Sequence, residues 1–210
     1  MRLRIFAFAA SVLLIAPAPG LSVTELLAKM AQQQRGLESY EVPIRMDIHL
    51  HRLISIHQFI TGTRYFKRPD RAALVVNAIP AEASAFQHIY EGLGTPETWP
   101  SKYVITMLPD TTYNTVPVYE LEGVPRKLGN VDHVILDVAT DSYAPVRARW
   151  FYHNGATSEM QIFENRIDGK YLLPVTEIVQ ISFPSYEAHG TVSYGNYKLN
   201  QPIQDSVFEH

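Results

Sequence analysis

Hydrophobic and polar residues follow a helical period in the segment after residue 20. Ser22 and Glu25 have the spacing of a capping box, in which each side chain caps the backbone amide of the other residue. Gly36 provides a C-terminal stop. The pattern predicts an amphipathic helix over residues 23–35, whose apolar face carries four residues at i, i+3, i+4 and i+7: Val23, Leu26, Leu27 and Met30.

From residue 40 onward the period is two, which is typical of strands with one buried and one solvent-facing side. The first such segment, residues 44–51, alternates the apolar residues from Ile44 to Leu50 with arginine, aspartate and histidine. Similar segments are separated by turns rich in Gly, Pro, Asn and Asp. They predict further strands at residues 56–66, 72–76, 103–108, 113–122, 131–138, 146–153, 156–166, 171–183 and 188–199.

The connections between these segments predict an antiparallel arrangement. Asn154-Gly155 predicts a hairpin with a type I′ turn, and Asp168-Gly169 predicts another hairpin. Residues 81–91 predict a second, short helix. No alternation of strands and helices is present, so the fold class is α+β. We expect a strongly curled antiparallel sheet, a half-open and incomplete barrel, because such a sheet must hide its edges, with the helices plugging the open side.

The first 20 residues have the pattern of a secretory signal peptide. A short basic start is followed by an apolar run over residues 5–16 and by the small residues and prolines of 17–20. Twelve apolar residues are too few for a helix to span a bilayer. We therefore expect residues 1–20 to be removed on export and residues 21–210 to form a single domain. Removal takes away two arginines and no acid, so the net charge changes from −3 to −5.

Composition excludes several classes of function. The absence of cysteine excludes a disulfide scaffold, a cysteine nucleophile, a cysteine-ligated metal and a cysteine-linked lipid anchor. The mildly acidic charge argues against binding of nucleic acid. Neither a complete phosphate-binding glycine motif nor an H-E-x-x-H zinc motif occurs. The sequence therefore predicts a protein that is not an enzyme, with no catalytic residue and no cofactor.

The histidines suggest one alternative to a protein without catalytic function. His49 and His51 lie two residues apart and thus share a strand face, and His57 faces His51 if the hairpin is centred on Ile54. Three imidazoles on one face could bind zinc or copper, and a secreted metal-dependent hydrolase using these three residues is one alternative function. We favour a solvent-exposed face without metal, because these positions alternate with apolar residues.

Two segments carry a resemblance to a known family. The residues from 62 to 71 read GTRYFKRPDR, and those from 196 to 208 read NYKLNQPIQDSVF. With the helix that follows the signal peptide, they resemble the outer-membrane lipoprotein carriers of the LolA/LolB type, a superfamily that includes regulators of the RseB type. The region from residue 77 to residue 100 departs from the carrier pattern.

The resemblance implies a periplasmic carrier or chaperone, expected as a monomer, that binds a lipid, a lipoprotein acyl chain or another apolar ligand in a hydrophobic cavity. The implied partners are the lipid or acylated protein and a transport partner in the inner or outer membrane. An RseB-like envelope sensor that binds a partner protein is the second alternative function. Residues expected to line the cavity are Ile48, Leu50, Ile60, Val104, Trp150 and Ile162, with Leu26, Leu27 and Met30 in the lid. A basic turn over residues 67–71 contributes Lys67, Arg68 and Arg71, which could contact an anionic head group or a partner.

Overall fold

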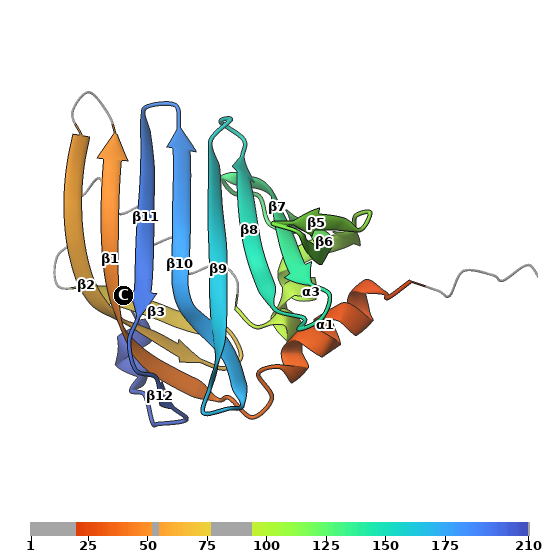
Figure 1. Cartoon of the computed structure of the whole chain (residues 1–210), viewed down its shortest axis with the longest axis horizontal. Helices are drawn as coiled ribbons and strands as arrows, with labels where there is room; N and C mark the ends of the chain where they lie inside the picture. Colours follow the sequence, from red (N-terminus) through yellow and green to blue (C-terminus); the bar gives the residue numbers. More distant parts are fainter. Residues whose placement is uncertain (1–19, 52–54, 77–93, 210) are drawn as a thin grey trace, which may run out of the picture.

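A single antiparallel sheet dominates the computed structural model, which describes residues 20–51, 55–76 and 94–209. The strand order is β3-β2-β1-β11-β10-β9-β8-β7-β6-β4, with β12 paired to β1 and β5 paired to β6 (Figure 1). The strands are β1 (Ser39–His51), β2 (Ser55–Lys67), β3 (Arg71–Val76), β4 (Tyr103–Met107), β5 (Thr111–Tyr113), β6 (Val116–Pro125), β7 (Val131–Ala139), β8 (Pro145–Tyr152), β9 (Thr157–Ile167), β10 (Tyr171–Phe183), β11 (Tyr186–Tyr194) and β12 (Lys198–Leu199).

The sheet is curled and open, as the sequence predicts. Within the described residues β3 and β4 end the strand order and do not pair with each other, so the barrel does not close. A bulge between Pro174 and Thr176 interrupts the β9–β10 register, and bulges of this kind increase local bending and twist. The alternation of β1 continues across the sheet, since Met46 faces Ile60 on β2 and Val192 on β11, and all three are buried. We call this side of the sheet the inner face and the opposite side the outer face.

The described α-helices lie together near the β4 end of the sheet (Figure 1). Helix α1 (Val23–Gln32) begins with the predicted capping box and buries Leu26, Leu27 and Met30. It contacts η2 (Pro96–Thr98) and β4, and α3 (Trp99–Lys102) follows η2 directly. The C-terminal turn η3 (Asp205–Phe208) contacts β3. None of the described helices has the length and apolar character needed to cross a membrane.

Some predictions fall outside the described residues. These are the signal peptide over residues 1–20, of which the structure describes only residue 20, and the short helix over residues 81–91. The plugging of the open side by helices stays a prediction, because α1, η2 and α3 gather at one end of the described sheet.

Both predicted hairpins are present, but the turn type predicted for the first of them is wrong. Asp168 and Gly169 have φ of 51° and 64°, the positive pair that a type I′ turn requires. In the Asn154-Gly155 loop, by contrast, only Gly155 has positive φ, at 79°. Its amide donates to the carbonyl of Tyr152 (2.9 Å), while the Tyr152 amide donates to the carbonyl of Ala156 (3.0 Å). This is a type I turn followed by a bulge, which adds one residue to the loop and leaves Asn154 in an ordinary conformation.

The last predicted strand is also divided in two. β11 ends at Tyr194 and β12 covers only Lys198 and Leu199. Between them, the Gly195 amide donates to the Pro43 carbonyl, so the chain remains beside β1 through the break.

Candidate functional site

A cavity of about 120 Å³ lies between the inner face of the sheet and the segments that carry α1, η2 and α3. Helical segments contribute Met30 and Trp99, and the loop before β8 contributes Tyr143. The position of the cavity follows from the amphipathic pattern of α1, because the apolar stripe of this helix faces the sheet. Most of the lining is apolar or aromatic and includes Met30, Phe66, Ala72, Trp99, Tyr143, Ala144, Met160, Ile162 and Leu173.

Polar side chains from three strands meet on the inner face beside this cavity. Arg64 of β2 donates from Nη1 to the hydroxyl of Tyr194 (2.6 Å), and that hydroxyl donates to Oε2 of Glu177 (2.6 Å). Arg64 Nη1 also lies 3.6 Å from Glu177 Oε1. The Glu177 side chain is 3% exposed and the Arg64 side chain 17% exposed, so the pair is nearly removed from water. Such a pair stabilises the fold only while both charges are present, since either charge alone would be buried without compensation.

Glu164 adds a carboxyl group to the same cavity wall, and this group, unlike that of Glu177, is mostly uncharged. Its burial, together with the negative charge of Glu177, raises the pKa of Glu164 to about 8. Its Oε2 atom is buried and has no hydrogen-bond partner among the described residues. Glu164 is therefore mostly protonated at neutral pH, and its neutral carboxyl group faces the cavity.

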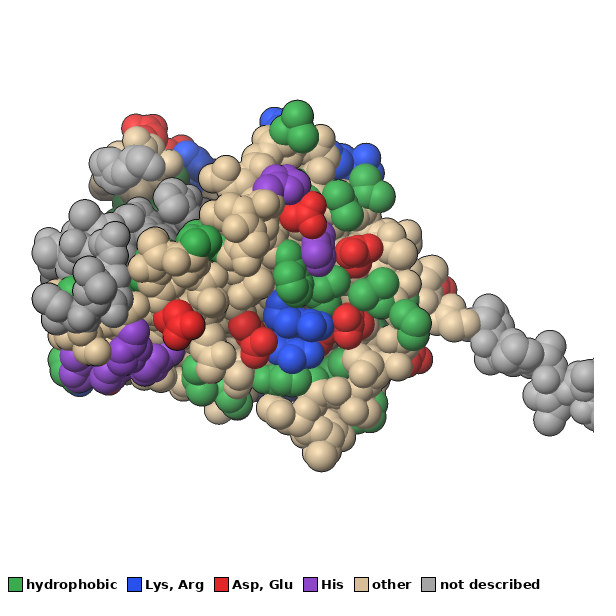
Figure 2. Space-filling model, turned by 90° about the horizontal axis from the view of Figure 1, so that it is seen from above, with side chains coloured by type: hydrophobic (Ala, Val, Ile, Leu, Met, Phe, Trp, Pro, Cys, Tyr) green, Lys and Arg blue, Asp and Glu red, His purple; other side chains and the backbone are tan. Residues whose placement is uncertain are grey.

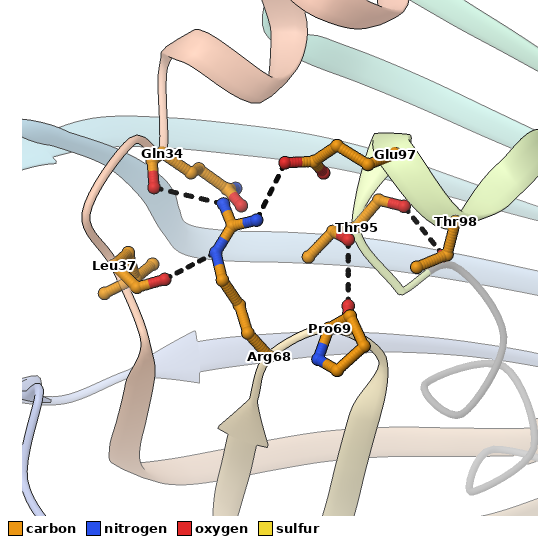
Figure 3. A network of polar contacts seen from close by, with 7 residues as sticks. All are labelled: Gln34, Leu37, Arg68, Pro69, Thr95, Glu97 and Thr98. Carbon is orange, nitrogen blue, oxygen red and sulfur yellow. Dashed lines mark hydrogen bonds and ion pairs between the residues drawn. The ribbon is translucent and has the colours of Figure 1, made fainter.

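Arg68 attaches the helical segments to the sheet (Figure 3). Its guanidinium donates to the carbonyl of Leu37 (2.7 Å), to the carbonyl of Gln34 (3.2 Å) and to Oε1 of Glu97 (2.7 Å). Burial alone would raise the pKa of Glu97, but the hydrogen bond and charge of Arg68 outweigh it and lower that pKa. One side chain thus joins the end of the α1 segment, the β2–β3 turn and η2.

Thr95 provides a second link at this point. Its hydroxyl donates to the carbonyl of Pro69 (2.8 Å), and the hydroxyl of Thr98 donates to the carbonyl of Thr95 (Figure 3). The segment before η2 is therefore held to the β2–β3 turn both by the Arg68–Glu97 pair and by a neutral hydrogen bond.

The other two cations of the basic turn hold the C-terminal segment. Lys67 Nζ lies 2.7 Å from Asp205 Oδ1, and Arg71 Nη1 lies 2.6 Å from the same oxygen. The hydrogen bond from Lys67 and the charge of Arg71 lower the pKa of Asp205. Arg71 also lies over the ring of Phe208 at 4.9 Å. Lys67, Arg68 and Arg71, which the sequence offers for a head group or partner, each have an acidic partner within the chain.

The predicted cavity residues are distributed over three places. Met30 and Ile162 line the cavity itself. Leu27 and Val104 border a separate groove of about 520 Å³ between α1 and β4, and Val104 is half exposed. The others, Leu26, Ile48, Leu50, Ile60 and Trp150, are buried in the core without lining the cavity.

Histidines gather on the outer face, away from the cavity. The predicted pairing of His51 with His57 is wrong, because His57 pairs with His49 and His51 pairs with Ser55. The hairpin centre lies one residue earlier than Ile54, a shift that moves each partner by two residues and keeps it on the same face. His189 of β11 pairs with His49 from the other side. Figure 2 shows the resulting group of histidine side chains at the surface, at the lower left of the view.

Comparison with solved structures finds the same architecture at low sequence identity. A LolA superfamily protein from Nitrosomonas europaea superposes with a TM-score of 0.66 at 13% identity, over 90% of this chain and 98% of that chain. This chain has the LolA fold. A putative outer membrane lipoprotein-sorting protein domain from Vibrio parahaemolyticus gives 0.66 at 11% identity, over 88% and 94% of the two chains. A DUF1329 family protein from Desulfovibrio piger gives 0.62 at 15%, over 90% and 96%. No protein-family model and no curated protein sequence matches the chain.

In this LolA fold, sequence reasoning missed the polar side chains of the inner face. Arg64 follows Ile60 at an even spacing, so its parity on β2 already places it on the buried side. Glu177 shares its parity with Val179 and Ile181 on a strand that is otherwise apolar on that side. A charged residue at an inward position of an apolar strand is the signal that could have found both of them.

Proposed function

We propose that this protein is a non-catalytic carrier, exported to the periplasm, that binds a lipid or the acyl chain of a lipoprotein on the inner face of its sheet. The observation that carries the proposal is the apolar cavity between α1 and the sheet, lined by Met30, Phe66, Ile162 and Leu173. The LolA fold supports it, because a protein domain described as a putative outer membrane lipoprotein-sorting domain has the same architecture.

The size of the cavity implies that its cover, formed by α1 and the η2–α3 segment, moves when ligand enters. A cavity of about 120 Å³ is smaller than the roughly 300–1,000 Å³ of most ligand pockets. An acyl chain therefore needs α1 or the η2–α3 segment to lift from the inner face. Each methylene transferred from water then contributes about 0.8 kcal/mol, so a chain of ordinary length offsets the loss of the packing that the cover provides.

The polar groups of the cavity match an amphipathic ligand. A neutral Glu164 can donate a hydrogen bond from its protonated oxygen to an ester or amide carbonyl, whereas an ionised carboxylate could only accept one. The Arg64–Glu177 pair keeps its charges internally compensated, so it adds no net charge to the apolar wall. The cavity thus suits an acyl chain whose ester or amide group lies near Glu164.

Native mass spectrometry of protein purified without detergent from the periplasm of the producing cells tests this proposal. We expect a fraction of molecules to carry a lipid mass, and solvent extraction to release that lipid. Protein that carries no lipid and takes up none from added phospholipid vesicles would contradict carriage. A stoichiometric protein partner in its place would support the RseB-like alternative.

A further inference from the structure

Three histidines form a row across three neighbouring strands of the outer face. His57 on β2, His49 on β1 and His189 on β11 lie directly opposite one another in the two registers. Their rings stack, with centroids 4.0 Å apart for His49 and His57 and 4.8 Å apart for His49 and His189. His51 extends the group, with its ring 5.5 Å from that of His189. The strand spacing of about 4.8 Å accounts for this stacking.

A carboxylate completes the group. Asp47 precedes His49 by two residues on β1 and therefore shares the outer face. Its Oδ1 atom lies 2.7 Å from Nε2 of His57 and 3.3 Å from Nε2 of His49. One atom from each of Asp47, His49 and His57 can be chosen so that all three lie within 4.8 Å of one another. Two imidazole nitrogens from adjacent strands thus converge on one carboxylate oxygen.

We propose that Asp47, His49 and His57 bind a divalent transition-metal ion such as Zn²⁺ on the outer face. Imidazole nitrogen and carboxylate oxygen are ordinary zinc ligands at about 2.0–2.2 Å. The stacked rings of His49 and His57 must turn out of their nearly parallel arrangement, with an interplanar angle of 13°, to direct both nitrogens at one ion. Three protein ligands leave a coordination position for water or for an outside group. Hard ions such as Mg²⁺ prefer sites made of oxygen alone, so the site discriminates against them.

The exposure of these side chains makes the site accessible from solution. The His49 and Asp47 side chains are 40% exposed and the His57 side chain is 47% exposed. Among the described residues, the neighbouring charges on this face are Arg45, which lies over the ring of Phe59, and Glu187, which is opposite His51. The site is independent of lipid carriage, because the histidines and the cavity lie on opposite faces of the sheet.

Titration calorimetry of tag-free protein with Zn²⁺, at a pH of about 7.5, tests the site. We expect about one equivalent of Zn²⁺ to bind and no heat of binding from Mg²⁺. His57→Gln and Asp47→Asn should each weaken Zn²⁺ binding by at least about tenfold. The matched control is His153→Gln, since His153 also lies beside a carboxylate, at 3.3 Å from Asp132 Oδ1, but outside the proposed site. Its affinity should stay within about twofold of the unchanged chain.

Imidazole resonances in NMR spectra supply a readout that does not depend on affinity. We expect Zn²⁺ to shift the signals of His49 and His57 and to leave those of His133 and His153 unchanged. Binding should weaken as the pH falls from about 7.5 to about 5.5, because protons compete for the ligand nitrogens. The proposal is overturned if folded His57→Gln and Asp47→Asn, checked by circular dichroism, both bind Zn²⁺ as the unchanged chain does. It is equally overturned if His153→Gln abolishes binding.

Discussion

Arg68 Nη1 lies 2.7 Å from Oε1 of Glu97, and this pair joins the turn between β2 and β3 to the 3-10 turn beside α1. The same guanidinium donates to the carbonyls of Leu37 and Gln34. Because the Arg68 side chain is only 20% exposed, its contacts are better shielded from water than those of an ordinary surface ion pair. The attachment of the α1 segment and η2 to the β2–β3 turn therefore depends heavily on one side chain.

Arg68→Met should lower the free energy of unfolding by about 2–3 kcal/mol, because it removes hydrogen bonds from a charged donor to two carbonyls. Urea unfolding measures this loss, and amide exchange in α1 should become faster. Lys198→Met is the control, since Lys198 is 62% exposed in its pair with Glu41 and should change stability by less than about 0.5 kcal/mol. Equal losses in the two variants would show that Arg68 has no special role in attachment.

Glu164 makes stability depend on pH. The pKa of Glu164 is raised from 4.5 to about 8 by burial and by Glu177, so the folded chain retains a proton that the unfolded chain releases between these values. Stability is therefore highest below pH 4.5 as far as this group is concerned, and falls as the pH rises toward about 8, by up to about 1.4 kcal/mol per pH unit.

Glu164→Gln should remove this slope, because the amide does not titrate. Urea midpoints measured from pH about 5 to about 9 should fall for the unchanged chain and stay flatter for the variant. Glu209→Gln, at an exposed position, should follow the unchanged chain. Parallel curves for Glu164→Gln and the unchanged chain would mean that the carboxyl group is ionised in the fold.

Arg64 and Glu177 should be energetically coupled. Removing one partner leaves the other charge buried, so Arg64→Met and Glu177→Leu should each cost about 3–5 kcal/mol. The double variant should be more stable than the sum of the two losses predicts, with a coupling on the order of 1–3 kcal/mol. A double-mutant cycle in urea measures this coupling. Additive losses would show that the two charges do not compensate each other.

The local pattern of the sequence predicted most of the strands because each strand has one buried side. The alternation from Ile44 to Leu50 places these residues on the inner face as expected, and the helix that begins after Ser22 has its predicted cap. The turn chemistry was less decisive, since Asn154-Gly155 fits two loop lengths and only the backbone conformation distinguishes them.

The sites depend on register and on contacts between distant segments, which local patterns do not contain. The pairing of His49 with His57 depends on the position of the hairpin centre, and moving that centre by one residue would change the pairing. His189, which pairs with His49 from the other side, is 140 positions later in the chain. From the sequence alone, Arg68 can be recognised only as a residue that precedes a proline in a basic turn. Its role depends on the ion pair with Glu97, and only the folded structure brings these two residues into contact.

Two neighbouring alanines of β3 test whether the inner-face cavity holds an acyl chain. Ala72 lines the cavity, whereas Ala73 is directed to the opposite face by the alternation of the strand. Titration with a fluorescent fatty acid should show affinity reduced by at least about tenfold in Ala72→Phe, whose ring occupies the cavity, and changed by less than about twofold in Ala73→Phe. Unchanged binding by folded Ala72→Phe, or an equal loss in both variants, would show that the acyl chain does not bind in this cavity.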